Sequence, residues 1–215
     1  KLPGMSASTL LLFFTASAVL ALTPGPTMLL ALSNGVARGL RVAAFGILGA
    51  SIASALLIAT VSLGLGALLL ASENLFDALR ALGVLYLCWL AFKLWRTPPL
   101  TLNPAAVALD AKPITPRAAF WRCATVSLSN PKALLFFSAF LPQFIELAQP
   151  QAPQYLVLAA IFLSIDALVM LAYASAGRFA VNFLSTRSVT CINRGCALAM
   201  LLLAATLAVF RRGNG

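Results

Sequence analysis

Two ionisable side chains of this sequence are isolated within long uncharged, apolar stretches. Lys132 is the only charge between Arg122 and Glu146, and Asp166 is the only charge between Glu146 and Arg178. If these stretches cross a bilayer, each ion costs about 3 kcal/mol or more at the bilayer centre, so it should face the protein interior and mark a substrate or proton path. The carboxylate could accept and release a proton or hold an ammonium group, and the amine could bind a carboxylate.

A structural role for the same two charges stays open. An ion pair between Lys132 and Asp166 would fix the two helices that carry them against each other without contacting any ligand. Tyr173 follows Asp166 by seven residues. On a helix this spacing brings the two side chains near the same face, so the tyrosine could reach the same cavity.

Two proline-containing segments interrupt apolar stretches, namely Thr23-Pro24-Gly25-Pro26 and Ser129-Asn130-Pro131-Lys132. Proline removes a backbone donor and clashes with the preceding turn, so each segment should break a helix and leave backbone groups without helical partners. In lipid such groups are tolerated only beside a protein-lined or wet cavity, and broken helices at matching positions indicate a substrate site near the middle of the membrane. The alternative is a pair of simple proline kinks.

The composition places the elements that carry these residues in a membrane. The chain has 215 residues, of which 61% are apolar and 9% charged, with 15 Lys and Arg, five Asp and Glu and no His. Soluble domains carry about 25% charged residues, so this chain cannot build a water-facing surface. The basic residues are separated by long apolar runs rather than gathered on a polar surface, which argues against nucleic-acid binding.

Six segments are long and apolar enough to cross the hydrocarbon core, which takes about 20 residues of helix. They are residues 6–32, 42–70, 75–95, 118–141, 155–177 and 190–210. The proline-rich linker 97–117 separates a first three-helix repeat, 1–96, from a second, 118–215. Because each half has an odd number of spans, the second half enters the membrane from the opposite side. The predicted fold is therefore an all-α membrane protein of six helices, built as two inverted repeats with broken first helices.

The loop charges predict the orientation in the membrane. Ten basic residues flank three loops on one side: Arg38, Arg41, Lys93, Arg96, Lys112, Arg117, Arg122, Arg178, Arg187 and Arg194. Four lie on the other side: Lys1, Arg80, Arg211 and Arg212. Cytoplasmic loops carry the excess of Lys and Arg, so the three loops should be cytoplasmic and both termini periplasmic.

The side chains that metal and redox chemistry need are scarce. Without His, and with one acid deep in an apolar stretch, a metal site or other cofactor is not expected. Cys88, Cys123, Cys191 and Cys196 show no CxxC spacing and are read as small apolar helix residues. A thiol-redox carrier of two inverted halves remains an alternative, although it needs a cysteine in the first helix of each half. Small residues from Gly35 to Ala53, among them Gly39, Gly46 and Gly49, predict close helix packing.

Taken in order, five segments resemble the signatures of the LysE/RhtB amino-acid exporters. They are Thr23-Pro24-Gly25-Pro26, the glycine-rich stretch from Gly35 to Gly49, Gly83-Val84-Leu85-Tyr86-Leu87, Asn130-Pro131-Lys132-Ala133 and Leu141-Pro142-Gln143-Phe144. The similarity covers nearly the whole chain. It departs at Thr27, where many relatives have Asn, and at Ala50-Ser51, where many have Gly followed by a polar or acidic residue.

The resemblance implies a bacterial inner-membrane exporter of amino acids or close relatives, driven by the proton gradient and often a homodimer. It also implies that Pro24-Gly25-Pro26 and Asn130-Pro131-Lys132 are the family's motif segments and that Asp166 is its span-five acid. From this we expect a substrate site built from Thr23, the two motif segments and Tyr173, with proton coupling at Asp166. A passive channel for small solutes is the main alternative, and it differs in that it cannot accumulate substrate.

Overall fold

The computed structural model describes residues 5–23, 25–71, 73–96, 114–146, 148–183 and 186–209. Within these ranges the chain is helical and contains no strand. Pro24 and most of the proline-rich linker, residues 97–113, lie outside the described residues, as do Lys1, Lys112, Arg211 and Arg212.

Helices cover the apolar segments of the described chain, and the helix in the first of these segments is broken. The N-terminal half comprises α1 (Ala7–Leu22), α2 (Pro26–Arg38), α3 (Leu40–Ala71) and α4 (Glu73–Arg96). The break after Leu22 confirms the interruption predicted at the first proline segment. The bend between α1 and α2 is 59°, far more than gentle helix curvature, so this is a break rather than a slight kink.

The C-terminal part of the described chain also contains a broken helix, and this one is more irregular. It comprises α6 (Pro116–Leu128), α7 (Pro131–Leu135), the π-helix η1 (Phe136–Phe140), the 3₁₀ helix η2 (Leu141–Phe144), α8 (Gln151–Phe183) and α9 (Thr186–Val209). The break at residues 129–130 was predicted, whereas the change to π and 3₁₀ geometry after α7 was not. Pro142 contributes to that change, because it lacks the N–H that a continuing α-helix would need.

Local sequence explains where these helices begin. The hydroxyl of Ser6 accepts from the Thr9 amide at 3.1 Å at the start of α1, and Thr115 Oγ1 accepts from the Ala118 amide at 3.2 Å at the start of α6. Helices α2, α6 and α7 have proline at their first position, where the missing N–H costs nothing. Gly39 separates α2 from α3 at φ +84°, a conformation that L side chains rarely adopt.

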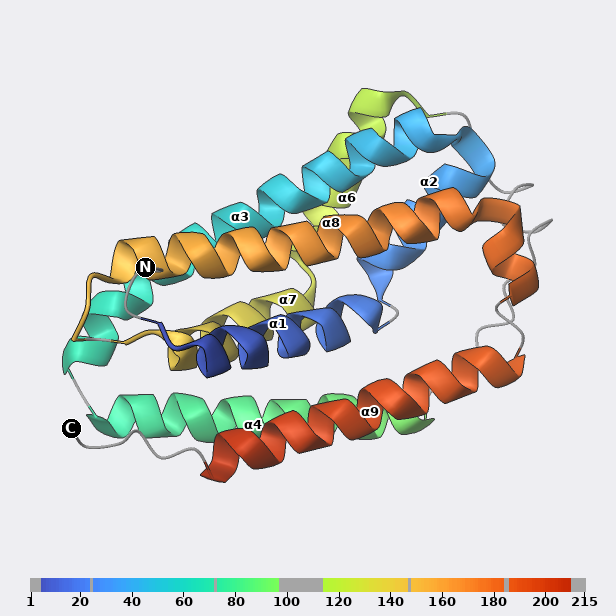
Figure 1. The fold of residues 1–215 in the computed structure, drawn as a ribbon. Helices are drawn as coiled ribbons and strands as arrows, with labels where there is room; N and C mark the ends of the chain where they lie inside the picture. Colours follow the sequence, from blue (N-terminus) through green and yellow to red (C-terminus); the bar gives the residue numbers. More distant parts are fainter. Residues whose placement is uncertain are drawn as a thin grey trace.

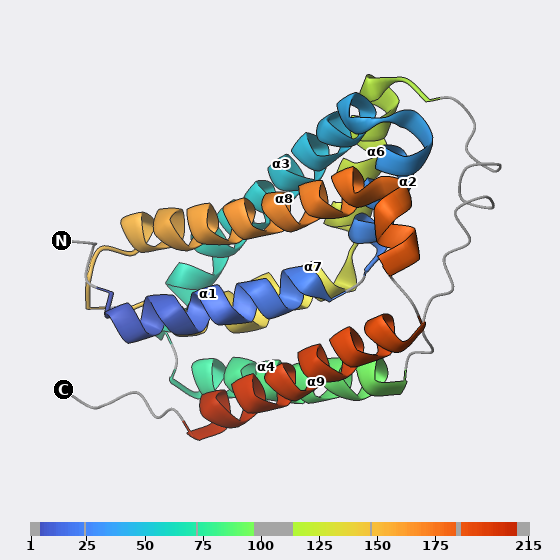
Figure 2. The ribbon, with the colours of Figure 1, turned by 45° about the vertical axis from the view of Figure 1, so that its right-hand side comes forward.

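Two layers of helices enclose the broken segments. Helix α3 packs against α6 and α8, and α4 lies beside α9 on the far side of the molecule (Figure 1). The α1 and α7 halves lie between these layers, as both views show (Figure 2). Chain direction differs between the two broken helices: α1 leads toward α2 in one sense, and α6 leads toward α7 in the opposite sense.

Among the described residues, two helices are long and apolar enough to cross a membrane on their own, Leu40–Gly64 and Gln151–Ser175. The bent pair α1–α2 makes a third if it counts as one span. Many of the large apolar side chains on these helices point outward; Leu63, for example, is 83% exposed and Leu168 66%. Because water would disfavour so many exposed apolar side chains, this surface suits lipid.

Small residues set the closest helix contacts, as predicted. A Cβ at Gly35 would collide with the backbone of Ala174 in α8, and one at Gly49 would collide with the backbone of Phe120 in α6. Gly39 is different, because a Cβ there would meet nothing within 4 Å. The prediction that Gly39 belongs to the packing ridge is therefore wrong, since the backbone turn explains this glycine.

An aromatic cluster fixes the irregular segment η1–η2 against α1 and α8. Phe13 of α1 lies 5.1 Å from Phe144 and 6.1 Å from Phe136 between ring centroids. Phe162 of α8 meets Phe137 edge-on at 4.8 Å. Aromatic pairs at these distances contribute beyond the area they bury, so the segment that follows the second break is held firmly from both sides.

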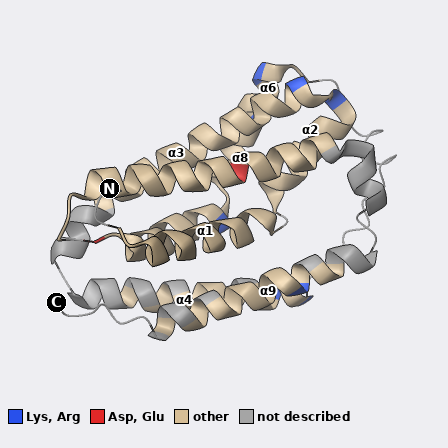
Figure 3. Ribbon diagram, viewed as in Figure 1, with Lys and Arg blue, Asp and Glu red and all other residues tan. Residues whose placement is uncertain are grey.

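The described charges are unevenly distributed along the molecule (Figure 3). Basic residues gather at the end of the molecule where α2 and α4 finish and α6 begins. They are Arg38, Arg41, Lys93, Arg96, Arg117 and Arg122. Arg194, in the first half of α9, belongs to the same end and contacts the Trp95 ring of α4. Glu146, which follows η2, lies at the opposite end.

Candidate functional site

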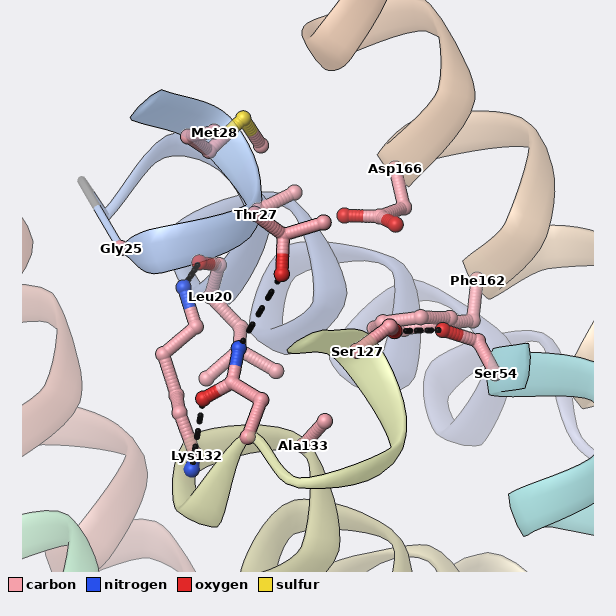
Figure 4. Close-up of a pocket in the computed structure, with 12 residues that line it drawn as sticks. Leu20, Gly25, Thr27, Met28, Ser54, Ser127, Lys132, Ala133, Phe162 and Asp166 are labelled. Atoms are coloured by element: carbon pink, nitrogen blue, oxygen red, sulfur yellow. Dashed lines mark hydrogen bonds between the residues drawn. The ribbon is translucent and has the colours of Figure 1, made fainter. Parts of the chain in front are cut away.

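The two helix breaks meet at one pocket in the interior of the helix bundle (Figure 4). The pocket contains about 410 Å³ of space free of protein atoms, part of it open to the outside. Its lining comes from α1, α2, α3, α6, α7, α8 and the segments between them: Leu20, Ala21, Gly25, Thr27, Met28, Ser54, Ser127, Asn130, Lys132, Ala133, Phe162 and Asp166.

Lys132 binds the end of the first broken helix. Its Nζ donates to the carbonyl of Leu20 at 2.6 Å and to that of Thr23 at 2.9 Å. These carbonyls belong to the last turn of α1 and its C-cap, where intrahelical donors run out. The positive charge also suits the negative end of the α1 dipole. The amine of the second break thus stabilises the backbone that the first break exposes.

Asn130 connects the second break to the first at another point. Its Oδ1 accepts from the Lys132 amide at 3.1 Å and so caps α7. Its Nδ2 donates to Thr27 Oγ1, near the start of α2, at 3.4 Å. The Asn130 side chain therefore caps the helix that follows the second break and also contacts α2, the helix that follows the first break.

Asp166 reaches the pocket from the middle of α8, and its carboxylate points toward Thr27 (Figure 4). Among the described residues, no ion pair joins Asp166 to Lys132, whose amine is occupied by the α1 carbonyls. The alternative of a direct ion pair between them is not realised in this conformation. The acid instead remains open to a ligand or a proton in the pocket.

Ser54 and Ser127 complete the wall formed by α3 and α6. Their hydroxyl oxygens are 3.3 Å apart, and Ser127 Oγ also donates to the Ala50 carbonyl at 3.4 Å. Neither serine is among the site residues predicted from the sequence, and Thr27 is not predicted as a pocket residue either. For Thr27 a signal was present, because the chain departs there from the family pattern; for the serines no local signal distinguishes them from other small helix residues.

The predicted site residues divide into three groups. Gly25, Asn130, Lys132 and Asp166 line the pocket, and Thr23 lies at its edge through its carbonyl. Pro26 begins α2 without lining the pocket, Pro131 begins α7, and Pro24 lies outside the described residues. Tyr173 is absent from the lining and packs instead with the cluster around Met28, Met170 and Ala174.

The pocket offers complementary polar groups to a small zwitterion. The first turn of α2 follows Gly25, which supplies no side-chain cap, so amides at the positive end of this helix remain available to an anion. The Asp166 carboxylate suits an ammonium group. No group of three or more His, Cys, Asp or Glu residues that could hold a metal occurs among the described residues.

The chain is similar in sequence to known efflux proteins. A family model described as LysE type translocator matches residues 18–210. A homoserine/homoserine lactone efflux protein of Salmonella typhi is 32% identical over 204 residues, covering 93% of this chain and 95% of the relative. A leucine efflux protein of Enterobacter sp. (strain 638) is 32% identical over 167 residues, covering 77% and 78%. No solved structure matches.

The apolar outer surface and the match to a family of translocators identify a membrane transporter rather than an enzyme. The match over residues 18–210 shows that the chain belongs to the LysE type translocator family. The family resemblance drawn from the sequence motifs is thereby confirmed.

Proposed function

We propose that this chain is a secondary active exporter that moves amino acids or close derivatives out across the bacterial inner membrane. The observation that carries the proposal is the meeting of both helix breaks with Asp166 at one pocket. The relatives add support, because homoserine, homoserine lactone and leucine are the compounds named for the efflux proteins that this chain resembles. Neutral amino acids are therefore the first substrates to test.

A zwitterionic substrate would bind with its two charges on opposite walls. The ammonium group would contact the Asp166 carboxylate, and the carboxylate group would contact the free amides at the start of α2. Lys132 adds to the second contact, because an ammonium has three donors and two of them are used by α1. Substrate binding would thus engage groups from both broken helices.

The transport cycle we propose is alternating access between two inverted three-helix repeats, residues 1–96 and 118–215. The opposite directions of the two broken helices support this architecture. The gathering of described basic residues at one end supports an orientation with that end in the cytoplasm and both chain termini in the periplasm. A homodimer, as the family resemblance implies, would be detected as the mass of the detergent-purified protein.

Proton influx would drive substrate efflux through Asp166. Protonation from the periplasm would neutralise the carboxylate and release the ammonium group of the substrate, and deprotonation to the cytoplasm would restore the binding site. Inside-out vesicles with an acidic lumen test this, because an antiporter will accumulate labelled homoserine or leucine in that lumen above the external concentration. Equilibration without accumulation would instead identify a passive facilitator.

Two variants separate coupling from general damage. Asp166→Asn should abolish accumulation, whereas Glu146→Gln, which changes the exposed acid after η2, should retain it. Full gradient-driven accumulation by Asp166→Asn would remove the carboxylate from the coupling mechanism. Replacing Cys88, Cys123, Cys191 and Cys196 with Ala should leave transport intact, and loss of transport would favour the thiol-redox alternative.

A further inference from the structure

The two serines of the pocket form an isolated pair of buried hydroxyls on the wall made by α3 and α6 (Figure 4). Each of Ser54 and Ser127 is 3% exposed, and their oxygens lie 3.3 Å apart. The charged groups of the pocket come from other helices, since Lys132 is on α7 and Asp166 on α8. The hydroxyl pair is therefore a separate polar feature of the same pocket.

The hydrogen bonds of the pair leave capacity unused. A hydroxyl has one donor and two acceptor sites. If Ser127 donates to the Ala50 carbonyl, Ser54 donates to Ser127, and no group in the described part of the chain donates to Ser54. If Ser127 donates to Ser54, the Ser54 hydrogen finds no acceptor in that part of the chain. In both arrangements Ser54 can form a further hydrogen bond toward the pocket.

The neighbour of the serine pair in the pocket is apolar. Phe162 lies beside Ser127 and Ser54 (Figure 4), and its side chain has no donor or acceptor of its own for a hydroxyl. A substrate side chain that enters this region therefore meets an apolar surface with one polar position. A leucine side chain would cover the serines without satisfying them, whereas a hydroxyl-bearing side chain would satisfy both itself and Ser54.

We propose that Ser54 and Ser127 form the side-chain subsite of the exporter and favour amino acids that carry a hydroxyl over branched aliphatic ones. This inference rests on the proposed function and names the substrate class of the same site. A site that hydrogen-bonds a substrate hydroxyl discriminates against analogues that lack it, because the buried polar group is then left unpaired. Homoserine should accordingly be preferred to leucine.

The test compares the uptake of two substrates into inside-out vesicles. Rates of uptake of labelled homoserine and leucine are measured for the unchanged protein and for the double variant Ser54→Ala/Ser127→Ala. The ratio of homoserine to leucine rates should fall about tenfold in the double variant, the change that corresponds to loss of one or two net hydrogen bonds. Ser54→Ala alone keeps the Ser127 bond to Ala50 and should give part of the shift.

Ser17→Ala is the matched control, because Ser17 is a fully buried serine of α1 that does not line the pocket. It should leave the substrate ratio unchanged. If the serines only join α3 to α6, both substrates will slow by the same factor in the double variant, and that result would overturn the inference while the exporter function stands. If the unchanged protein moves neither amino acid, the proposed function fails and this inference fails with it.

Discussion

Lys132 illustrates how a half-buried charge can serve the backbone as well as a ligand. From the sequence it was a candidate for binding a carboxylate or for pairing with Asp166. In the structure its amine donates to two carbonyls at the end of α1. An unsatisfied carbonyl in the membrane interior costs several kcal/mol. By donating to these two carbonyls, the lysine lowers the energetic cost of the first helix break. Its first role is to position the pocket.

Removal of the Lys132 amine should therefore destabilise the protein. Lys132→Met keeps the length of the side chain but leaves the Leu20 and Thr23 carbonyls without this donor. We expect the free energy of unfolding in mixed micelles to fall by about 2 kcal/mol, the value typical of a hydrogen bond to a charged group. Arg41→Met, at an exposed position of α3, should change it by less than about 0.5 kcal/mol. Equal stability of both variants would contradict the role assigned to Lys132.

At the scale of the helices, two capping residues allow a contribution to stability to be separated from a contribution to transport. Thr115 caps α6 and Asn130 caps α7 by the same kind of hydrogen bond from side chain to backbone amide. Only Asn130 lines the pocket. Replacing either residue with Ala should cost about 1 kcal/mol of stability.

Transport separates the two cap variants. Asn130→Ala should also slow homoserine uptake into vesicles, because it removes the contact between the second break and Thr27. Thr115→Ala should leave the uptake rate per folded molecule near that of the unchanged protein. Similar transport by the two variants would mean that the Asn130 side chain acts only as a cap.

Two glycines of α3 offer a matched pair for testing helix packing. A Cβ at Gly49 would collide with the backbone of α6, while one at Gly64 would meet nothing within 4 Å. Gly49→Ala should destabilise the protein by about 1–3 kcal/mol through overpacking. Gly64→Ala should be neutral or stabilising, because alanine favours a helix interior over glycine by about 1 kcal/mol. Unfolding in mixed micelles measures both, and a harmless Gly49→Ala would show that α3 and α6 can separate freely.

At the scale of the whole molecule, the uneven charge distribution predicts which end faces the cytoplasm. In a variant without its four native cysteines, Arg41→Cys at the basic end should react with a membrane-impermeant maleimide only in inside-out vesicles. Glu146→Cys at the other end should react only in intact spheroplasts. Both positions are exposed. The reverse pattern would show that the basic end faces the periplasm and would contradict the proposed orientation.

Much of this fold could be predicted from the sequence because its strongest signals are local. Apolar runs predict the helices, and the two proline segments predict both helix breaks. The partners across helices carry no such signal. Backbone carbonyls look the same at every residue, so the Lys132 contacts with Leu20 and Thr23 could not be predicted, and the pocket serines resemble any serine on a membrane helix. The prediction that Tyr173 reaches the pocket rested on helical spacing alone. That spacing does not show which neighbouring helix packs against the tyrosine.

The bond between Lys132 and the Leu20 carbonyl spans 112 residues, and this separation bears on how the protein is made. A ribosome completes α1 long before it reaches Lys132, so the carbonyls at the end of α1 are without that donor while the first half enters the membrane. They must meanwhile bind water or another transient donor. The first helix break can therefore reach its final form only after the second half of the chain has been synthesised and inserted.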